Sequence, residues 1–401
     1  MKKLLMIPLL VILVAASGCE QKQIITQLEV GEKKLLGAGL VLEAVENLKR
    51  AEIEEGNKTK PRALLAIAYA HGISTGMARI QDPALEEEYK RERERRVAAL
   101  GEAEMKVIFQ VLDDRHRVQM DAKQILVDKG VDVVPLVLDN LKKGRYSNLQ
   151  TDFAEMLMEI GTKAVPQILA AINDTDTPID VKLRLVRLIG DIGDQGAISE
   201  LESMRNSSKS SGLKMAITTT LYRLGKKEYR AEIIAGLSGT DVRERRAAAW
   251  AMRYLNDSPT AEIANALKDS DNRVRLICVG ALETYPSEIA VRPLVNLLNS
   301  DSNTNVKNAS VIALTAHADN GFGKGLAVLL IDELISSKVA DSEDRLRLVQ
   351  LLKKKAVQKQ IKMSPEDMNL EWKIWEYRKS VEQSDMVKDE LDYLLQELES
   401  D

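Results

Sequence analysis

One serine of this 401-residue chain has the spacing of a catalytic nucleophile. Residues 71–76 read HGISTG, which places Ser74 between two glycines, as in the sharp turn that presents the nucleophile of many hydrolases. That turn needs a strand before it and a helix after it. Here an alanine-rich segment leads into the motif and predicts a helix. We therefore expect residues 71–76 to form a simple turn and Ser74 not to be a nucleophile.

Residues that could bind a metal ion do not form a complete set. The segment from Asp301 has the opening spacing of a calcium loop, but Val306 replaces the required glycine and Ile312 replaces the bidentate glutamate. We expect Asp301 to cap a helix instead. The three histidines, His71, His116 and His317, stand apart in the sequence and read as surface or packing residues. No metal, no cofactor and no catalytic residue is predicted, and the chain is expected not to be an enzyme.

Cys19 has a spacing that suggests covalent lipid attachment. Lys2 and Lys3 precede an apolar run of 13 residues, 4–16, which has the length of a signal-peptide core and is shorter than the roughly 20 residues of a membrane span. Small residues at 16–18 then lead to Cys19, which resembles the lipobox of bacterial lipoproteins. The resemblance implies cleavage after Gly18, with diacylglycerol on the Cys19 sulfur and a further fatty acyl chain such as palmitate. The alternative is an ordinary signal peptide with a cysteine nearby by chance.

Lipidation of Cys19 has consequences for the compartment and for the second cysteine. Two or three acyl chains, at about 0.8 kcal/mol per buried CH₂, anchor a protein to a membrane durably. Cys278 is then left without a partner and is expected to be a small buried hydrophobe. Glu20 is not the aspartate that retains some lipoproteins in an inner membrane. The expected location is the exported side of the cell membrane, which in a host with two membranes favours the periplasmic face of the outer membrane.

Composition favours helix throughout the chain. Ala, Leu, Glu, Lys and Arg are abundant, whereas aromatic residues make up only 4%. The formal net charge is −4, so no bulk nucleic-acid binding is expected. No second apolar run after residue 18 is long enough to cross a bilayer.

A motif of about 31 residues recurs through the middle of the chain. Helical patterns end at Gly161, Gly193, Gly225, Asn256 and Pro286, at spacings of 32, 32, 31 and 30 residues. Two amphipathic helices fit within each repeat, and each has one apolar face. Two helices alone cannot bury these faces, so neighbouring repeats are predicted to stack. Asp and Ser in the loops between paired helices stand where N-cap residues belong.

Five basic residues fall at corresponding positions near the start of the second helices. They recur at spacings of 32, 31, 30 and 32 residues, and they are Lys182, Lys214, Arg245, Arg275 and Lys307. One interpretation is an internal ladder in which these residues pair with the loop acids Asp241, Asp271 and Asp301. The other is a basic stripe that binds an acidic partner. The sequence leaves both open.

This period, with Asp in the turn and a basic residue at the start of the second helix, resembles HEAT repeats, especially the short HEAT-like repeats of bilin lyases, over residues 131–320. The resemblance implies an all-α fold, an armadillo-like α-solenoid, in which the second helices line a concave surface. The bilin-lyase activity itself is disfavoured for an exported chain.

The predicted domains follow from these patterns. Residues 1–18 are the signal peptide, 19–30 a short tether, 31–128 a helical module, 129–320 the repeat array and 321–401 a C-terminal helical cap that includes Trp372 and Trp375. Within the helical module, Ala44, Leu48 and Ala51 have spacing similar to that of a tetratricopeptide unit. The mixed-charge segment 83–100 is expected to be a solvated helix with pairs at i, i+4.

The predicted function is a membrane-anchored, non-catalytic scaffold or adaptor that binds another envelope protein. The alternative is an enzyme, or an accessory subunit of one, that acts on an anionic envelope polymer through a concave basic stripe. A third possibility is a structural link between membrane and wall. The sequence does not identify the partner or the oligomeric state.

Overall fold

The structure is a computed structural model that describes residues 26–114, 117–255, 259–336, 339, 341–365 and 368–400. The predicted signal peptide, Cys19 and His116 lie outside these residues. Every regular element of the described residues is a helix, which confirms the all-α prediction. Within them, each helix is too short or too polar to span a bilayer. The chain divides into two compact units, residues 1–133 and 134–401, where the sequence suggested a boundary at 128/129.

The first unit is built around one buried helix, α3 (Thr59–Ser74). Apolar residues cover every side of α3, so other helices must surround it. Helices α2, α5, α6 and α7 do so. Ala44, Leu48 and Ala51 of α2, the residues with tetratricopeptide-like spacing, are fully buried. The remaining helices of this unit are α1 (Gln27–Glu32), a π-helical segment (Lys33–Ala38), α2 (Val41–Glu54), α4 (Met77–Gln81), α5 (Pro83–Ala99), α6 (Glu102–Asp113) and α7 (Gln119–Asp128).

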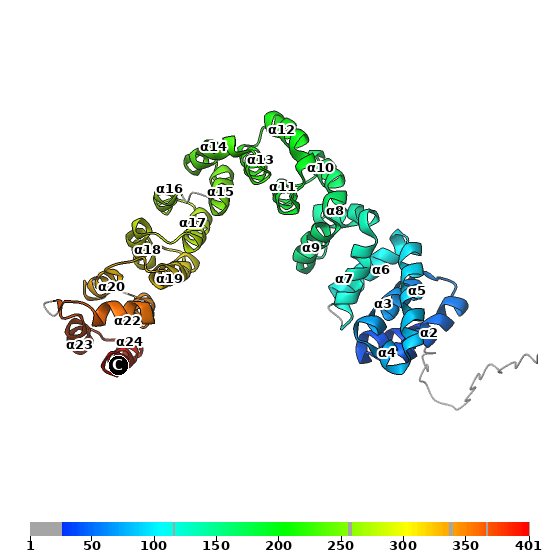
Figure 1. The fold of residues 1–401 in the computed structure, drawn as a ribbon, viewed down its shortest axis with the longest axis horizontal. Helices are drawn as coiled ribbons and strands as arrows, with labels where there is room; N and C mark the ends of the chain where they lie inside the picture. The colour runs from blue at the N-terminus through cyan, green and yellow to red at the C-terminus, as the bar shows by residue number, and fades with distance from the viewer. Residues whose placement is uncertain are drawn as a thin grey trace, which may run out of the picture. The chain divides into compact units, whose positions relative to one another are not determined.

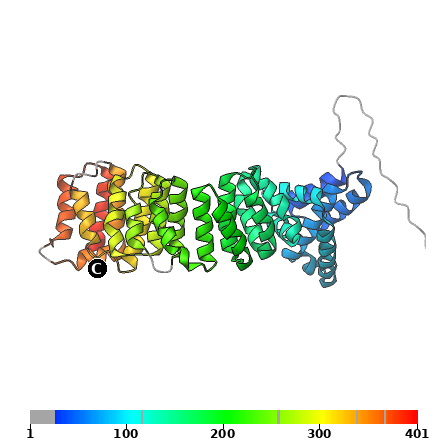
Figure 2. The same cartoon turned by 90° about the horizontal axis from the view of Figure 1, so that it is seen from above.

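The second unit is a stack of helix pairs, as the repeat predicted (Figure 1). The first helices of the pairs are α8 (Val134–Lys142), α10 (Val165–Asn173), α12 (Ile198–Ser207), α14 (Arg230–Ala235), α16 (Thr260–Ala266) and α18 (Glu288–Ser300). The second helices are α9 (Gln150–Ile160), α11 (Ile179–Ile192), α13 (Ser211–Arg223), α15 (Val242–Ala251), α17 (Asn272–Thr284) and α19 (Thr304–Asp319). Each second helix contacts the next one, which makes a continuous layer, and Figure 2 shows the helices of this unit side by side. We call it the second-helix layer.

Local signals set where these helices begin and end. Gly161 and Gly193 have positive φ angles, 70° and 78°, directly after α9 and α11, because glycine carries no Cβ that would clash there. Asp241 and Asp271 cap α15 and α17, since their carboxylates accept hydrogen bonds from backbone N–H groups of the first turn. The predicted stops and caps are therefore present at these positions.

The stack continues beyond residue 320, where the sequence placed a separate cap. Helices α21 (Ser342–Leu352) and α24 (Asp385–Glu399) extend the second-helix layer, because α19 contacts α21 and α21 contacts α24. Their paired helices are α20 (Leu326–Ile335) and α23 (Leu370–Ser380). An inserted helix, α22 (Lys355–Lys362), lengthens the spacing and hides the repeat in the sequence. Trp372 and Trp375 of α23 are half-exposed.

Candidate functional site

The five predicted basic residues occupy the same position in successive second helices. Each lies four residues after the N-cap residue of its helix, in the first two turns of α11, α13, α15, α17 and α19. One turn after the cap, a long side chain reaches the loop of the next repeat. The structure therefore places these side chains in register along the second-helix layer, and it divides them into two groups by what they contact.

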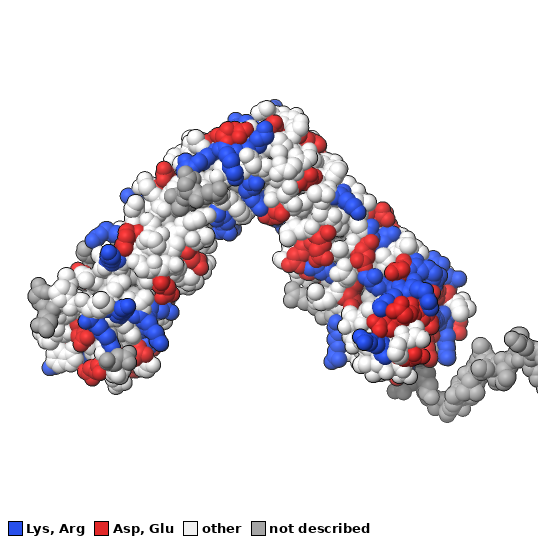
Figure 3. All heavy atoms as spheres, in the orientation of Figure 1, with Lys and Arg blue, Asp and Glu red and all other residues white. Residues whose placement is uncertain are grey.

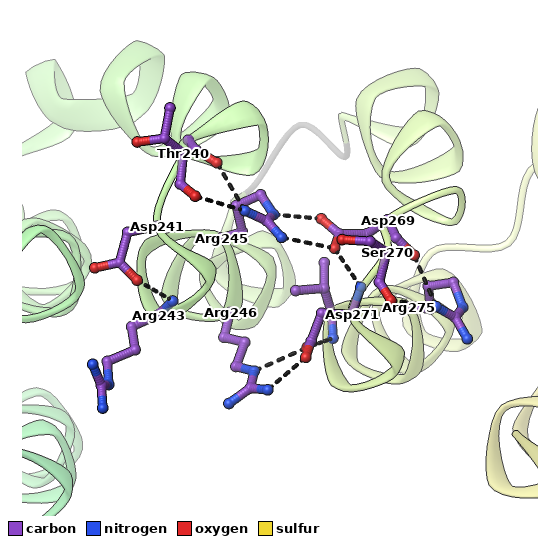
Figure 4. A network of polar contacts seen from close by, with 11 residues as sticks. Thr240, Asp241, Arg243, Arg245, Arg246, Asp269, Ser270, Asp271 and Arg275 are labelled. Carbon is purple, nitrogen blue, oxygen red and sulfur yellow. Dashed lines mark hydrogen bonds and ion pairs between the residues drawn. The ribbon is translucent and has the colours of Figure 1, made fainter.

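Arg245 and Arg275 form a ladder between repeats (Figure 4). Arg245 Nε and Nη2 donate to the two carboxylate oxygens of Asp269 at 2.6 and 3.1 Å. Arg275 Nε and Nη2 donate to Asp301 in the same way, at 2.7 and 2.8 Å. Each guanidinium also donates through Nη1 to a carbonyl of its own loop, that of Gly239 at 3.0 Å for Arg245. These bidentate bonds tie each second helix to the next repeat.

The ladder extends past the predicted array. The Lys307 ammonium bonds to the Asp344 carboxylate, and Arg345 Nε and Nη2 donate to Glu382 at 2.8 and 3.0 Å. The side chain of Glu382 is fully buried and that of Asp344 nearly so. Arg345 lies four residues after its N-cap Asp341, as the five predicted residues do in their helices. The sequence analysis missed it because the inserted helix and a longer loop change the spacing.

The acids of the ladder are not those that the sequence suggested. Asp241 and Asp271 are N-cap residues, and the equivalent residue in the next repeat is Asn303, not Asp301. Asp301 therefore does not cap α19. It lies two residues before the cap, where its carboxylate accepts hydrogen bonds from Arg275 and from the Asn303 backbone N–H at 2.8 Å. The expectation of a helix-capping Asp301 was wrong, because the cap residue is the one whose carbonyl begins the helix.

Electrostatics supports the ladder. Burial opposes ionisation of Asp301, but hydrogen bonds from Arg275 and from the Asn303 backbone outweigh it and lower the pKa of the Asp301 carboxyl. Hydrogen bonding to Asp269 and to Asp301 raises the pKa of Arg245 and of Arg275. A hydrogen bond from Arg246 is the main cause that lowers the pKa of Asp271, to about 2. These pairs are ionised across the neutral range, so the ladder charges neutralise one another.

Lys182 and Lys214 do not join the ladder. Within the described part of the chain, neither ammonium makes a hydrogen bond or an ion pair. The reason lies one repeat further on. Where Asp269 stands two residues before its N-cap, the loops facing Lys182 and Lys214 carry Ser208 and Gly239, which have no carboxylate. Of the predicted basic column, two of the five charges are therefore available to a partner.

A groove lies beside Lys182. It has a volume of about 520 to 720 Å³ in the two best-formed inter-repeat hollows of the array, the larger being the one lined by Lys182. Its walls include the hydroxyl residues Thr177 and Ser208, and Lys209 adds a second ammonium, while Asp176 contributes one carboxylate. The smaller hollow is lined by Arg275 and Asp301 and so holds a ladder pair. The Lys182 groove is the polar hollow in which that pair is missing.

Charge is mixed over the surface. Figure 3 shows Lys and Arg side chains next to Asp and Glu side chains over the face in view. This distribution is what paired ladder charges produce. A continuous basic stripe of five residues is therefore not present, and Arg245, Arg275 and Lys307 are ladder residues.

The other sequence candidates lie in ordinary structural positions. Ser74 is at the end of α3, and its hydroxyl donates to the His71 carbonyl at 3.3 Å. His71 is not alone, because its Nδ1 lies 2.8 Å from Asp121 Oδ2 and so joins α3 to α7. His317 is buried, its Nδ1 lies 2.7 Å from the Ala313 carbonyl, and burial lowers its pKa. Among the described residues, no group of three or more His, Cys, Asp or Glu side chains is placed to hold a metal ion.

Cys278 is a free, fully buried thiol in α17, as predicted. Burial raises its pKa to about 12, so it is protonated and unreactive at neutral pH. It acts as a small apolar side chain in the core of the array.

Comparison with known families agrees with this geometry for part of the chain. The family model described as HEAT repeats matches residues 230–315, which span α14 to α19 and include the Arg245 and Arg275 ladder steps. No curated protein matches the chain. The stacked helix pairs of the second unit are thus an all-α solenoid with HEAT-like repeats.

Proposed function

We propose that this chain is an exported lipoprotein whose HEAT-like array is a non-catalytic scaffold or adaptor for another protein of the bacterial cell envelope. A solenoid presents a long surface made of successive repeats, which suits it to binding an extended partner. The observation that carries the proposal is the pair Lys182 and Lys214, two cations in register on the second-helix layer that the ladder leaves unpaired.

The proposed anchor is diacylglycerol on Cys19, which follows the apolar segment 4–16 and the small residues at 16–18. Substitution Cys19→Ala removes the acceptor sulfur, so the chain should leave the membrane fraction and no longer incorporate labelled palmitate. The array should keep its helicity, because Cys19 precedes every described helix. A Cys19→Ala chain that stays in washed membranes and still carries the label would contradict the anchor.

The scaffold role is tested by crosslinking in the envelope. We expect one specific protein to be captured by the native chain and lost from a Lys182→Gln, Lys214→Gln variant. The matched control is Lys354→Gln, Lys355→Gln, which removes two exposed lysines from the connection between α21 and α22. Equal loss from both variants would make the effect a general one of charge and would contradict the proposal. Capture of an anionic polymer in place of a protein would favour the alternative function.

A further inference from the structure

A second cluster of side chains lies on the second-helix layer and was not evident in the sequence. Arg187 comes from α11, Arg223 from α13, Trp250 from α15, and Tyr254 from the 3-10 turn that follows α15. The Arg187 guanidinium carbon lies 4.8 Å from the centre of the Trp250 ring. The Arg223 guanidinium carbon lies 4.3 Å from the centre of the Tyr254 ring and 5.6 Å from that of Trp250. Three successive repeats therefore contribute to what we call the Arg187–Trp250 cluster.

Arg223 is held in place by its surroundings. Its Nη2 donates to Asp191 at 2.6 Å, and its Nη1 donates to the Arg187 carbonyl at 3.3 Å. It lies across Gly190 of α11, where a Cβ atom would come within 2.7 Å of Nη1. Glycine inside a helix costs about 1 kcal/mol relative to alanine. At this position it makes room for the arginine of the next repeat.

Arg187 has no such partner. Its Nε is inaccessible to solvent and makes no hydrogen bond, and within the described residues its guanidinium forms no ion pair. The Trp250 ring is its principal contact. Burial lowers the pKa of Arg187, although its guanidinium remains charged at neutral pH. A partly buried cation without a counter-ion costs stability, which a purely structural position would not require.

A third guanidinium increases the excess of positive charge. Arg253 is exposed, and its charge acts on Arg187 strongly enough to contribute to the lowering of the Arg187 pKa. Its Nη2 reaches to 3.8 Å from the position of a Cβ on Gly280 of α17. Within the described residues, three guanidinium groups thus share one carboxylate, that of Asp191, which Arg223 already binds.

We propose that the Arg187–Trp250 cluster binds a glutamate- or aspartate-rich segment of the partner protein. This inference rests on the proposed scaffold function and specifies the chemistry of the partner. A planar guanidinium binds a carboxylate through two parallel hydrogen bonds, and Arg187 has those donors free. The Trp250 and Tyr254 rings beside it can cover the aliphatic stem of a glutamate. Arg, Trp and Tyr are the residues that carry most of the binding energy in protein interfaces. A phosphate-rich polymer would have no need of the aromatic rings.

The experiment uses the mature chain with Trp372→Phe and Trp375→Phe, which leaves Trp250 as the sole tryptophan. The probe is a hexaglutamate peptide, and binding is followed by Trp250 fluorescence. We expect the peptide to change the fluorescence in a salt-dependent manner and Arg187→Gln to weaken its affinity at least tenfold. Arg187→Lys keeps the charge without the fork and should weaken affinity less. The control is Arg273→Gln, which removes an exposed arginine from the start of α17 and should leave affinity within twofold.

Two results would overturn the proposal. One is equal binding by the Arg187→Gln and Arg273→Gln chains, or stronger binding of polyphosphate than of hexaglutamate. The other is a fall of more than a few degrees in the melting temperature of Arg187→Met, which would make Arg187 a structural residue. If the envelope partner is captured independently of Arg187, only this inference fails. If no partner is captured but hexaglutamate binding depends on Arg187, the scaffold proposal fails and the site remains.

Discussion

At the scale of single residues, the same basic position serves two purposes, and the next loop decides which. Arg245 and Arg275 each meet a carboxylate placed two residues before the following N-cap. That carboxylate also accepts the backbone N–H of the cap residue, as Asp269 does from Asp271 at 2.8 Å. One acid thus fixes the loop and joins two repeats. Where the acid is Ser208 or Gly239, the corresponding lysine is left to solvent or to a partner.

Removing one partner of the buried ladder should be costly. In the Arg275→Gln chain, Asp301 keeps a side chain that is 1% exposed but loses its counter-ion. Breaking a buried pair in this way costs about 3–5 kcal/mol. We expect urea unfolding to show a loss of that size, with Lys214→Gln within about 0.5 kcal/mol of the native chain because Lys214 is exposed and unpaired. Similar losses in the two variants would mean that the ladder does not stabilise the array.

Asp271 should make the array sensitive to acid. Its pKa is about 2 in the folded chain and is 3.8 ordinarily, so the folded state favours the ionised carboxylate. The resulting stability is present above about pH 4 and is lost as the pH falls through 2, with a total of about 2 kcal/mol. Thermal melts between pH 5 and pH 2 should show this loss, and Asp271→Asn should reduce it while lowering stability at pH 7. An unchanged pH profile in Asp271→Asn would contradict the assignment.

At the scale of elements, the second helices hold the array together, because they alone form an unbroken series of contacts from α9 to α24. The first helices vary more. Helix α14 covers only Arg230–Ala235, and α22 is inserted between the last two pairs. Insertions and short helices are tolerated in the first-helix layer because the ladder and the cap residues sit at the starts of the second helices.

A chain that ends at residue 320 should therefore be strongly destabilised, although the sequence pattern alone places the end of the array there. The truncation removes α20 to α24, exposes the apolar faces of α18 and α19 that pack on α20 and α21, and takes Asp344 from Lys307. A terminal repeat without a polar covering layer is prone to aggregation. We expect a lower melting temperature and self-association by light scattering. A monomeric chain with native melting would show that residues 321–401 are a dispensable cap.

At the scale of the whole molecule, the chain consists of two compact units, each with its own core. The core of the first unit centres on α3, and that of the second runs between its two helix layers. Residues 134–401 should therefore fold when expressed without residues 1–133. Circular dichroism should show native helicity per residue and a cooperative melt. A fragment that stays unfolded would show that the array depends on the first unit.

The sequence by itself determined the features that depend on residues close together in the chain. Apolar periodicity predicted the helix pairs, glycines at Gly161 and Gly193 predicted the helix ends, and the spacing of basic residues predicted their common position on the second helices. The HEAT-like resemblance over residues 131–320 supplied the fold. These features are local because caps, turns and amphipathic faces are satisfied within a few residues.

Only the tertiary structure decided which charges are paired. The partners in the ladder lie 24 to 37 residues apart, and their contact depends on how one repeat stacks on the next. For the same reason the sequence did not reveal that Arg187, Arg223 and Trp250 meet, since each comes from a different repeat with irregular spacing. It also could not follow the array past α19, because the inserted α22 disrupts the period while the helix layer itself continues through space.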